Sequence, residues 1–386
     1  MSAAPGLSRR ALLRALVAGG ALTGATALAG AAVARSQASP ALGGAPLRVG
    51  YLPITDAAPL LVAHHRGLYE QYGVPVAQPV LFRSWSSLAE AFLAGRVDVI
   101  HLLMPLAVQL RFGFEADARV IAWNHVNGSA LTVAPEVDDL AQLAGTSVGI
   151  PAWWSIHNVI TQRMLRAEGL TPVFRADPVA ARGEVNLVPM PPADMVPALG
   201  AGSISGFAVA DPFGAMAEVT GAGRTHRFLG DVWRDHACCA TVVRGDVLRG
   251  RPEAVAALTA ALVEAELHCD GHRHDAAASL SDGYLPQPEG AVRLALTRGP
   301  ESPVTVRAHP EWHGERLGFA PVPQAGYTAL LVEEMRTTLA DAPNGFLRGL
   351  DGERAHRELV DPAPLDALPA ALAARIDRTP RTEELA

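Results

Sequence analysis

Short apolar runs alternate with longer stretches of helical periodicity through most of the chain. Between residues 47 and 100, the apolar runs predict strands, and the amphipathic stretches predict helices that end at Gly73 and Gly95. The predicted elements are a strand at 47–51, a helix at 58–72, a strand at 76–82, a helix at 86–93 and a strand at 97–100. We interpret them as one right-handed β-α-β-α-β unit. In such an open sheet, ligands bind at the carboxyl ends of the strands.

The same order of elements continues along the chain. Further strands are predicted at 118–123, 130–133, 147–150, 186–189, 204–209, 227–229 and 240–243. Further helices are predicted at 137–143, 158–168 with Ser155 as N-cap, 192–199, 211–220, 252–267, 276–284, 289–296, 325–339 and 352–359. We expect two α/β lobes, because the chain crosses between the two sets of strands at 124–129 and at 233–239. The expected parts are a first lobe of 46–127 plus 236–374, a second lobe of 128–235, and a mobile tail of 375–386.

Length and composition agree with two domains and exclude several functions. A chain of 386 residues is too long for a single hydrophobic core, and its content of 49% hydrophobic and 18% charged residues is typical of a globular protein. The chain contains no lysine, so Schiff-base chemistry and phosphate binding by a P-loop lysine are excluded. The net charge of -7 argues against nucleic acid as a partner.

The first 38 residues have the pattern of an export signal. Residues 8–14 read S-R-R-A-L-L-R, which resembles a twin-arginine signal, and the uncharged stretch 15–34 follows. Small residues at 32–34 and 36–38 offer cleavage sites. We therefore expect residues 1–38 to be a signal peptide and the mature protein to be exported, to the periplasm or the outer face of the cytoplasmic membrane. The alternative is an uncleaved membrane anchor.

An ordered set of motifs resembles the substrate-binding proteins of ABC importers in the nitrate, bicarbonate and aliphatic-sulfonate (taurine) group. The motifs, in order, are G-Y-L-P-I-T-D-A-A-P-L at 50–60, G-L-Y-E-Q-Y-G-V at 67–74, S-W at 84–85 and A-G-R-V-D-V-I-H-L-L-M-P-L-A at 94–107. The resemblance implies the α/β, two-lobed periplasmic-binding-protein fold of type II, with two crossings that act as a hinge. It also implies a monomer without a cofactor that closes on a small-molecule ligand and delivers it to an ABC permease.

The resemblance also assigns four positions of the binding cleft. Trp85 stands at the tryptophan of the Ser-Trp loop, and His157 stands at the histidine that opens a helix of the second lobe. Ser129 replaces an expected glutamine, and Cys238 lies within the segment where a lysine is expected. Losing the only full positive charge weakens the case for nitrate or bicarbonate as ligand, because a buried anion needs a compensating group.

Four further residues are candidates for ligand contact. Asp56 follows the first strand, where an N-cap is the alternative role, and His101 directly follows a predicted strand end. His236 and Cys239 belong to the second crossing, together with Cys238. Neighbouring residues in a strand point to opposite faces, so only one of the two cysteines is expected to face the cleft. Alternatively, both cysteines are small apolar residues of the hydrophobic core.

The sequence contains two clusters of residues that could bind a metal ion. His236, Cys238 and Cys239 could supply nitrogen and sulfur ligands to zinc or copper, although their spacing is not that of a zinc finger. His101, His125 and His157 could join such a cluster from other loops. The histidine-rich segment 268–274 lies at a predicted helix end, where basic side chains are ordinary.

Two classes of function follow. The first is a binding protein without catalytic chemistry, because the sequence contains no nucleophile elbow, no dinucleotide-binding glycine motif and no H-E-x-x-H motif. The alternatives are a metal- or heterocycle-binding protein, or an enzyme of the same fold that resembles the pyrimidine synthases of thiamin synthesis. Those enzymes hold pyridoxal phosphate on a lysine, which this chain lacks. We therefore expect a binding protein and not an enzyme.

Overall fold

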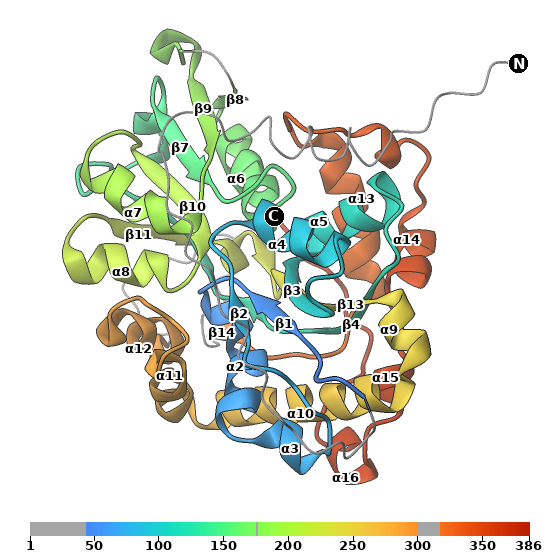
Figure 1. Ribbon diagram of the computed structural model, residues 1–386. Coiled ribbons are helices and arrows are strands. Elements are labelled where there is room, and N and C mark those ends of the chain that lie inside the picture. Colours follow the sequence, from blue (N-terminus) through green and yellow to red (C-terminus); the bar gives the residue numbers. More distant parts are fainter. Residues whose placement is uncertain (1–43, 175–176, 300–316) are drawn as a thin grey trace, which may run out of the picture.

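The computed structural model describes residues 44–174, 177–299 and 317–386. They form a two-lobed α/β protein in which each lobe has its own central sheet with helices packed around it (Figure 1). The predicted signal peptide at 1–38 lies outside the described residues. Within these residues, no helix is long and apolar enough to cross a membrane.

The sheet of the first lobe has the order β2-β1-β3-β13-β4. Its strands are β1 (Val49–Tyr51), β2 (Val80–Leu81), β3 (Val99–Leu103), β4 (Ala118–Trp123) and β13 (Cys239–Arg244). β1 runs parallel to both β2 and β3, as the predicted β-α-β-α-β unit requires. β13 enters from the second crossing and pairs antiparallel with β3 and β4. Every residue of β3 is buried, which is typical of a strand covered on both faces.

Helices cover both faces of this sheet. They are η1 (Thr55–Ala57), α2 (Ala58–His65), α3 (Leu68–Gln71), α4 (Trp85–Leu93), α5 (Met104–Val108), the π-helical turn η2 (Gln109–Gly113), α9 (Gly245–Gly250), α10 (Pro252–Gly271), α15 (Ala363–Asp366) and α16 (Ala370–Ala373). The single helix predicted at 58–72 is two helices, because Gly67 adopts the left-handed conformation with φ of 68°. β3 extends beyond the predicted end at Ile100, so His101 lies inside the strand.

The sheet of the second lobe has the order β11-β6-β10-β7-β9-β8. Its strands are β6 (Ser129–Val133), β7 (Ser147–Ile150), β8 (Thr171–Val173), β9 (Glu184–Pro189), β10 (Gly206–Ala210) and β11 (Arg224–Phe228). The helical segments of this lobe are η3 (Leu140–Leu143), α6 (Ile156–Ala167), η4 (Ala180–Arg182), α7 (Pro192–Gly200), α8 (Phe213–Thr220) and η5 (Leu229–Asp231). The predicted N-cap is confirmed, since the Ser155 side chain accepts a hydrogen bond from the Asn158 N–H. The strand pattern predicted for this lobe is also confirmed, with one added edge strand, β8.

The C-terminal part of the chain packs on the first lobe and also reaches the second. Its elements are α11 (Arg273–Ser281), α12 (Glu289–Thr297), β14 (Leu317–Gly318), α13 (Ala325–Thr337), η6 (Gly345–Leu347) and α14 (Gly352–Leu359). Ala291 of α12 packs against Ala215 of α8, and Gln162 of α6 donates a hydrogen bond to the Leu339 carbonyl oxygen at 2.7 Å. We expected these segments to pack on the first lobe. These additional contacts join the lobes along two sides of the molecule (Figure 1).

Short antiparallel pairs mark the two crossings between the lobes. The strands are β5 (Val126–Asn127) in the first crossing, β12 (Trp233–Arg234) in the second, and β15 (Glu384–Leu385) at the C-terminus. β5 pairs with β14, and β12 pairs with β15. The C-terminus therefore lies at the junction of the lobes, where it is seen near the centre of Figure 1.

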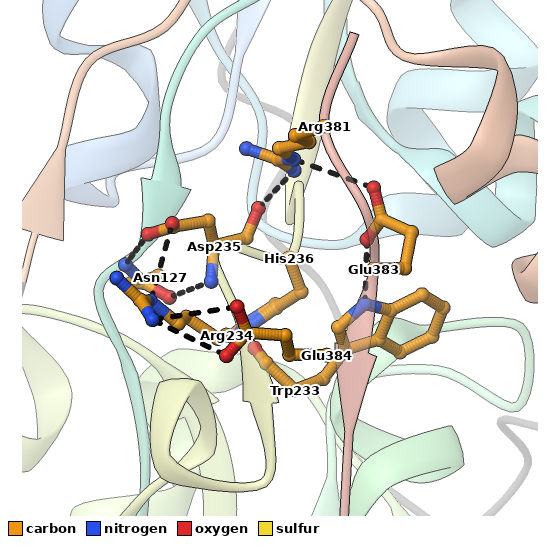
Figure 2. A network of polar contacts seen from close by, with 8 residues as sticks. All are labelled: Asn127, Trp233, Arg234, Asp235, His236, Arg381, Glu383 and Glu384. Atoms are coloured by element: carbon orange, nitrogen blue, oxygen red, sulfur yellow. Dashed lines mark hydrogen bonds and ion pairs between the residues drawn. The ribbon is translucent and has the colours of Figure 1, made fainter. Parts of the chain in front are cut away.

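The tail at 375–386 has defined contacts with the hinge, and its predicted mobility stays a prediction. Figure 2 shows the Trp233 Nε1–H donating to Glu383 Oε2 at 2.8 Å and the Asn127 side-chain N–H donating to Asp235 Oδ1 at 3.0 Å. The Glu383 side chain is only 6% exposed. The tail thus supplies Glu383 as a buried hydrogen-bond acceptor for Trp233 of the second crossing. Asn127 of the first crossing contacts the second crossing as well.

Candidate functional site

A cavity of about 830 Å³ lies between the lobes. Trp85 and Gln109 line it from the first lobe, Trp153 and Met190 line it from the second, and Asp341 lines it from the C-terminal part. Walls that belong to both lobes separate when a hinge opens, so the cavity has the geometry of a site for capture and release.

Trp85 stands at this cavity because of a capped helix start. The Ser84 side chain accepts a hydrogen bond from the Ser87 N–H at 3.2 Å, which begins α4 at Trp85. The indole is 3% exposed and stacks on the His101 ring, with 5.4 Å between the centroids and 30° between the planes. The tryptophan therefore separates the cavity from the polar interior that lies behind it.

The second lobe faces Trp85 with an aromatic wall. Trp153 and Trp154 follow β7 and precede the cap of α6. Trp154 is buried and packs edge-on against Phe346, with 5.8 Å between the ring centroids. Trp153 is half-buried and contacts Phe174 in the same manner at 5.5 Å. Part of the Trp153 indole thus remains available to a ligand.

The lining of the cavity is aromatic and largely uncharged. Among the described residues that line it there is no arginine or histidine, and Asp341 is the one charged residue. Gln109 offers both a donor and an acceptor, and Ser86 adds a hydroxyl group. Such a wall favours a planar, polar organic molecule and offers no cation to a buried anion.

A second feature lies behind Trp85, which we call the buried polar cluster. Its members are all 1% exposed or less and come from η1, β3, both crossings and the start of α6: Asp56, His101, His125, His157, Cys238 and Cys239. This many buried polar groups at a junction of lobes is unusual, because buried charges need partners.

Asp56 and His125 form an ion pair inside this cluster. The Asp56 Oδ2 and His125 Nε2 atoms lie 2.7 Å apart. Burial acts to raise the pKa of Asp56, but the adjacent His125 outweighs it and lowers this pKa to about 2. Burial acts to lower the pKa of His125, and Asp56 outweighs it and raises this pKa to about 10. At neutral pH the pair is therefore a carboxylate and an imidazolium.

Two other histidines are held neutral. The Leu52 backbone N–H donates to His101 Nε2 at 3.0 Å, which requires that nitrogen to be unprotonated. Burial lowers the pKa of His101 to about 4. His236 Nδ1 lies 2.8 Å from the Trp233 carbonyl oxygen, to which it donates, and burial lowers the pKa of His236 to about 3. Burial therefore keeps the imidazoles of His101 and His236 uncharged, in contrast to that of His125.

The cysteines adjoin this pair. Cys238 Sγ lies 3.7 Å from His157 Nε2 and 3.8 Å from Cys239 Sγ. His157 Nε2 also lies 3.0 Å from the Ser129 hydroxyl. Burial acts to raise the pKa of Cys238, but contacts with Cys239 and the histidines outweigh it and lower this pKa, whereas burial raises the pKa of Cys239. Cys238 is therefore the cysteine with thiolate character.

Residues 41–282, more than half of the chain, match the model of a known protein family. The chain belongs to the NMT1-like family. Among curated proteins, the nitrate/nitrite binding protein NrtA of Nostoc sp. is 26% identical over 244 residues, covering 58% of this chain and 53% of that protein. The nitrate import ATP-binding protein NrtC of Synechocystis sp. is 29% identical over 257 residues, covering 62% of this chain and 38% of that protein. The chain therefore spans about half or less of the length of these relatives.

Solved structures confirm the two-lobed fold. The periplasmic nitrate-binding protein NrtA from Synechocystis PCC 6803 is 20% identical with a TM-score of 0.66, over 85% of this chain and 92% of that one. A zinc-bound ligand-binding component of an ABC-type import system from Staphylococcus aureus is 21% identical with a TM-score of 0.63, over 86% and 99%. The predicted resemblance to importer binding proteins is confirmed, whereas the twin-arginine signal stays a prediction.

The NMT1-like match ends at residue 282, so it includes Trp85 and the buried polar cluster but not Asp341. Of the predicted contact residues, Trp85 alone lines the cavity. The others are all buried near the lobe junction, away from the cavity lining: Asp56, His101, Ser129, His157, His236 and Cys239. Their role as ligand contacts stays a prediction.

The sequence analysis did not select three residues of the cavity wall, and it did not predict the ion pair of Asp56 with His125. Trp153, Gln109 and Asp341 were not selected, and only the position of Trp153 before the Ser155 cap could have indicated it. His236, Cys238 and Cys239 were candidate metal ligands from the sequence, and among the described residues the compact group of possible ligands is Asp56, His125 and Cys238. His236 instead directs Nδ1 to the backbone of the second crossing.

Proposed function

We propose that the protein is the substrate-binding component of an ABC importer, which captures a small molecule between its lobes and delivers it to a membrane permease. The observation that carries this proposal is the cavity of about 830 Å³ with walls from both lobes. Closure buries the ligand against both walls, and reopening at the permease releases it. The relatives named as nitrate-binding and import proteins support the same role.

We further propose that the ligand is a planar organic molecule without a full negative charge. Small-molecule sites typically enclose about 300–1,000 Å³, and a nitrate ion would fill only a small part of this cavity. Trp85 and Trp153 offer flat apolar surface, while Gln109 can pair with a ring nitrogen or carbonyl group. A heterocycle of pyrimidine type meets these requirements.

Three finer points belong to the same proposal. The protein acts without catalysis, because capture and release need no covalent step. It works outside the cytoplasm, as the importer relatives indicate. It acts as a monomer, since each lobe wall of the cavity comes from the one chain.

A thermal-shift screen with two ligand classes tests the proposal. The purified full chain is heated with nitrate, bicarbonate and taurine in one series, and with neutral pyrimidines and related heterocycles in the other. We expect a heterocycle to raise the melting temperature, because binding to the native state alone stabilises it. Trp153→Ala should abolish the shift. Phe319→Ala, which removes a half-buried aromatic ring outside the cavity lining, should retain it.

Two results would contradict the proposal. Stabilisation by the anions alone would overturn the ligand class. A shift that persists unchanged in Trp153→Ala would overturn the location of the site, whichever ligand produced it.

A further inference from the structure

We propose that Asp56, His125 and Cys238 form a binding site for one divalent transition-metal ion of the zinc class, enclosed at the junction of the two lobes. This site does not depend on the proposed importer function, and it uses no residue of the cavity lining.

The three side chains bring an oxygen, a nitrogen and a sulfur ligand into one place. One ligand atom from each residue lies within 4.8 Å of the others, and all three side chains are fully buried. They come from three separate parts of the chain: the turn after β1, the first crossing and the second crossing. Convergence of distant segments on three metal-type ligands is what a built site requires.

The polar atoms of this group lack ordinary hydrogen-bond partners. Among the described residues, neither carboxylate oxygen of Asp56 and neither ring nitrogen of His125 has a hydrogen bond of normal geometry. The Asp56 Oδ2 and His125 Nε2 atoms lie 2.7 Å apart as an ion pair, but this contact does not have the geometry of a hydrogen bond. Buried polar atoms are nearly always satisfied, so an unfilled set indicates a missing bound species.

Two further ligand atoms of the kind that bind metals lie close to Cys238. Zinc bonds of about 2.0–2.3 Å place tetrahedral ligand atoms about 3.3–3.8 Å apart. His157 Nε2 and Cys239 Sγ lie 3.7 Å and 3.8 Å from Cys238 Sγ, so both atoms are near the sulfur ligand, but neither belongs to the compact set of three. The Asp56–His125 contact is shorter than this spacing, so these two side chains would move apart as the ion enters between them.

The donor set selects the class of ion. Calcium and magnesium take oxygen ligands almost alone, and copper(I) takes mainly sulfur. A carboxylate, an imidazole and a thiolate together are typical of zinc sites. An ion at this position would also connect the first lobe to both crossings, because each of these parts supplies one ligand.

Cobalt substitution provides the test. The full chain, without a histidine tag, is stripped with a chelator, loaded with Co²⁺ or Zn²⁺, desalted and analysed for bound metal. We expect one ion per chain and a thiolate-to-cobalt charge-transfer band in the near ultraviolet. Cys238→Ser should lose the band, and Asp56→Asn should weaken metal binding. Cys269→Ser removes another buried free cysteine and should behave as the wild type does.

Three outcomes would overturn the site. These are a wild-type chain that retains no metal, a band that survives in Cys238→Ser, or metal that is lost only on His272→Ala, in the surface pair His268–His272. Circular dichroism of each variant separates loss of metal from loss of fold. Heterocycle binding, tested through Trp153, is scored independently, so failure of either proposal leaves the other measurable.

Discussion

An ion pair connects the second lobe to the C-terminal part of the chain. The Arg298 guanidinium donates to both carboxylate oxygens of Glu218, at 2.8 Å and 3.2 Å, and the Thr225 N–H donates to one of them at 3.0 Å. Burial acts to raise the pKa of Glu218, but Arg298 outweighs it and lowers this pKa below its usual value. The Arg298 side chain is 6% exposed and that of Glu218 is 26% exposed.

The substitution Glu218→Gln keeps the shape of the side chain and removes its charge. Breaking a fully buried pair costs about 3–5 kcal/mol, whereas an exposed pair contributes about 1 kcal/mol or less. Because this pair is mostly buried and glutamine retains one acceptor, we expect the free energy of unfolding to fall by about 2 kcal/mol at pH 7.

The pH dependence identifies the cause. A carboxyl group with a lowered folded pKa stabilises the protein above its unfolded pKa, near 4.5, and this stabilisation is lost as the pH falls through the folded pKa. The difference between wild type and Glu218→Gln should therefore be full at pH 7 and should shrink as both proteins are acidified below the unfolded pKa. Protonated glutamic acid and glutamine are then nearly equivalent.

Urea unfolding followed by circular dichroism at several pH values measures this difference. Glu353→Gln is the matched control, because that side chain is 77% exposed and its contact with Arg357 spans 3.6 Å. It should change the midpoint little at any pH. A Glu218→Gln effect that is the same in acid and at neutral pH would refute the electrostatic reasoning and assign the loss to packing.

Three other substitutions test the hinge and its surroundings. Trp233→Phe removes the donor to Glu383 and should lower stability by about 1–3 kcal/mol, with faster proteolysis of the tail as the readout. Gly128→Ala forces a side chain onto a residue with φ of 69° and into the Leu317 side chain, so thermal unfolding should show a clear loss of stability. Tyr327→Phe removes a hydroxyl that donates to a backbone carbonyl of the second crossing, and a loss of about 1 kcal/mol in urea unfolding is expected.

The lobes were predictable because their signals are local. Apolar runs and glycine ends predicted the strands of both sheets except the edge strand β8, and the Ser155 cap predicted the start of α6. The split at Gly67 was not predictable, because a helix tolerates an isolated glycine and only tertiary packing decided that this one adopts the left-handed conformation. The bridging role of the C-terminal helices depends on contacts such as Gln162 with Leu339, which no local pattern encodes.

Site residues were predictable where the family resemblance assigned their positions. The contact between Asp56 and His125, which sets the charges of the site, was not predictable. Trp85 and His157 were selected by position, but the charge of the buried polar cluster depends on Asp56 meeting His125, whose separation in sequence carries no periodic signal. Without that pairing, burial would keep both groups neutral.

Trp85 is the element that relates the two proposed sites. Its ring stacks on that of His101, a member of the buried polar cluster that accepts a hydrogen bond from the Leu52 backbone, and Trp85 also lines the cavity. The stacked rings of Trp85 and His101 therefore connect the cavity lining to the buried polar cluster. Trp85 belongs to a capped helix start and His101 to a fully buried strand, so regular elements hold both rings. We expect these two rings to shield the cluster from water, and a dry site is the condition under which the proposed carboxylate, imidazole and thiolate set would hold an ion in place of a proton.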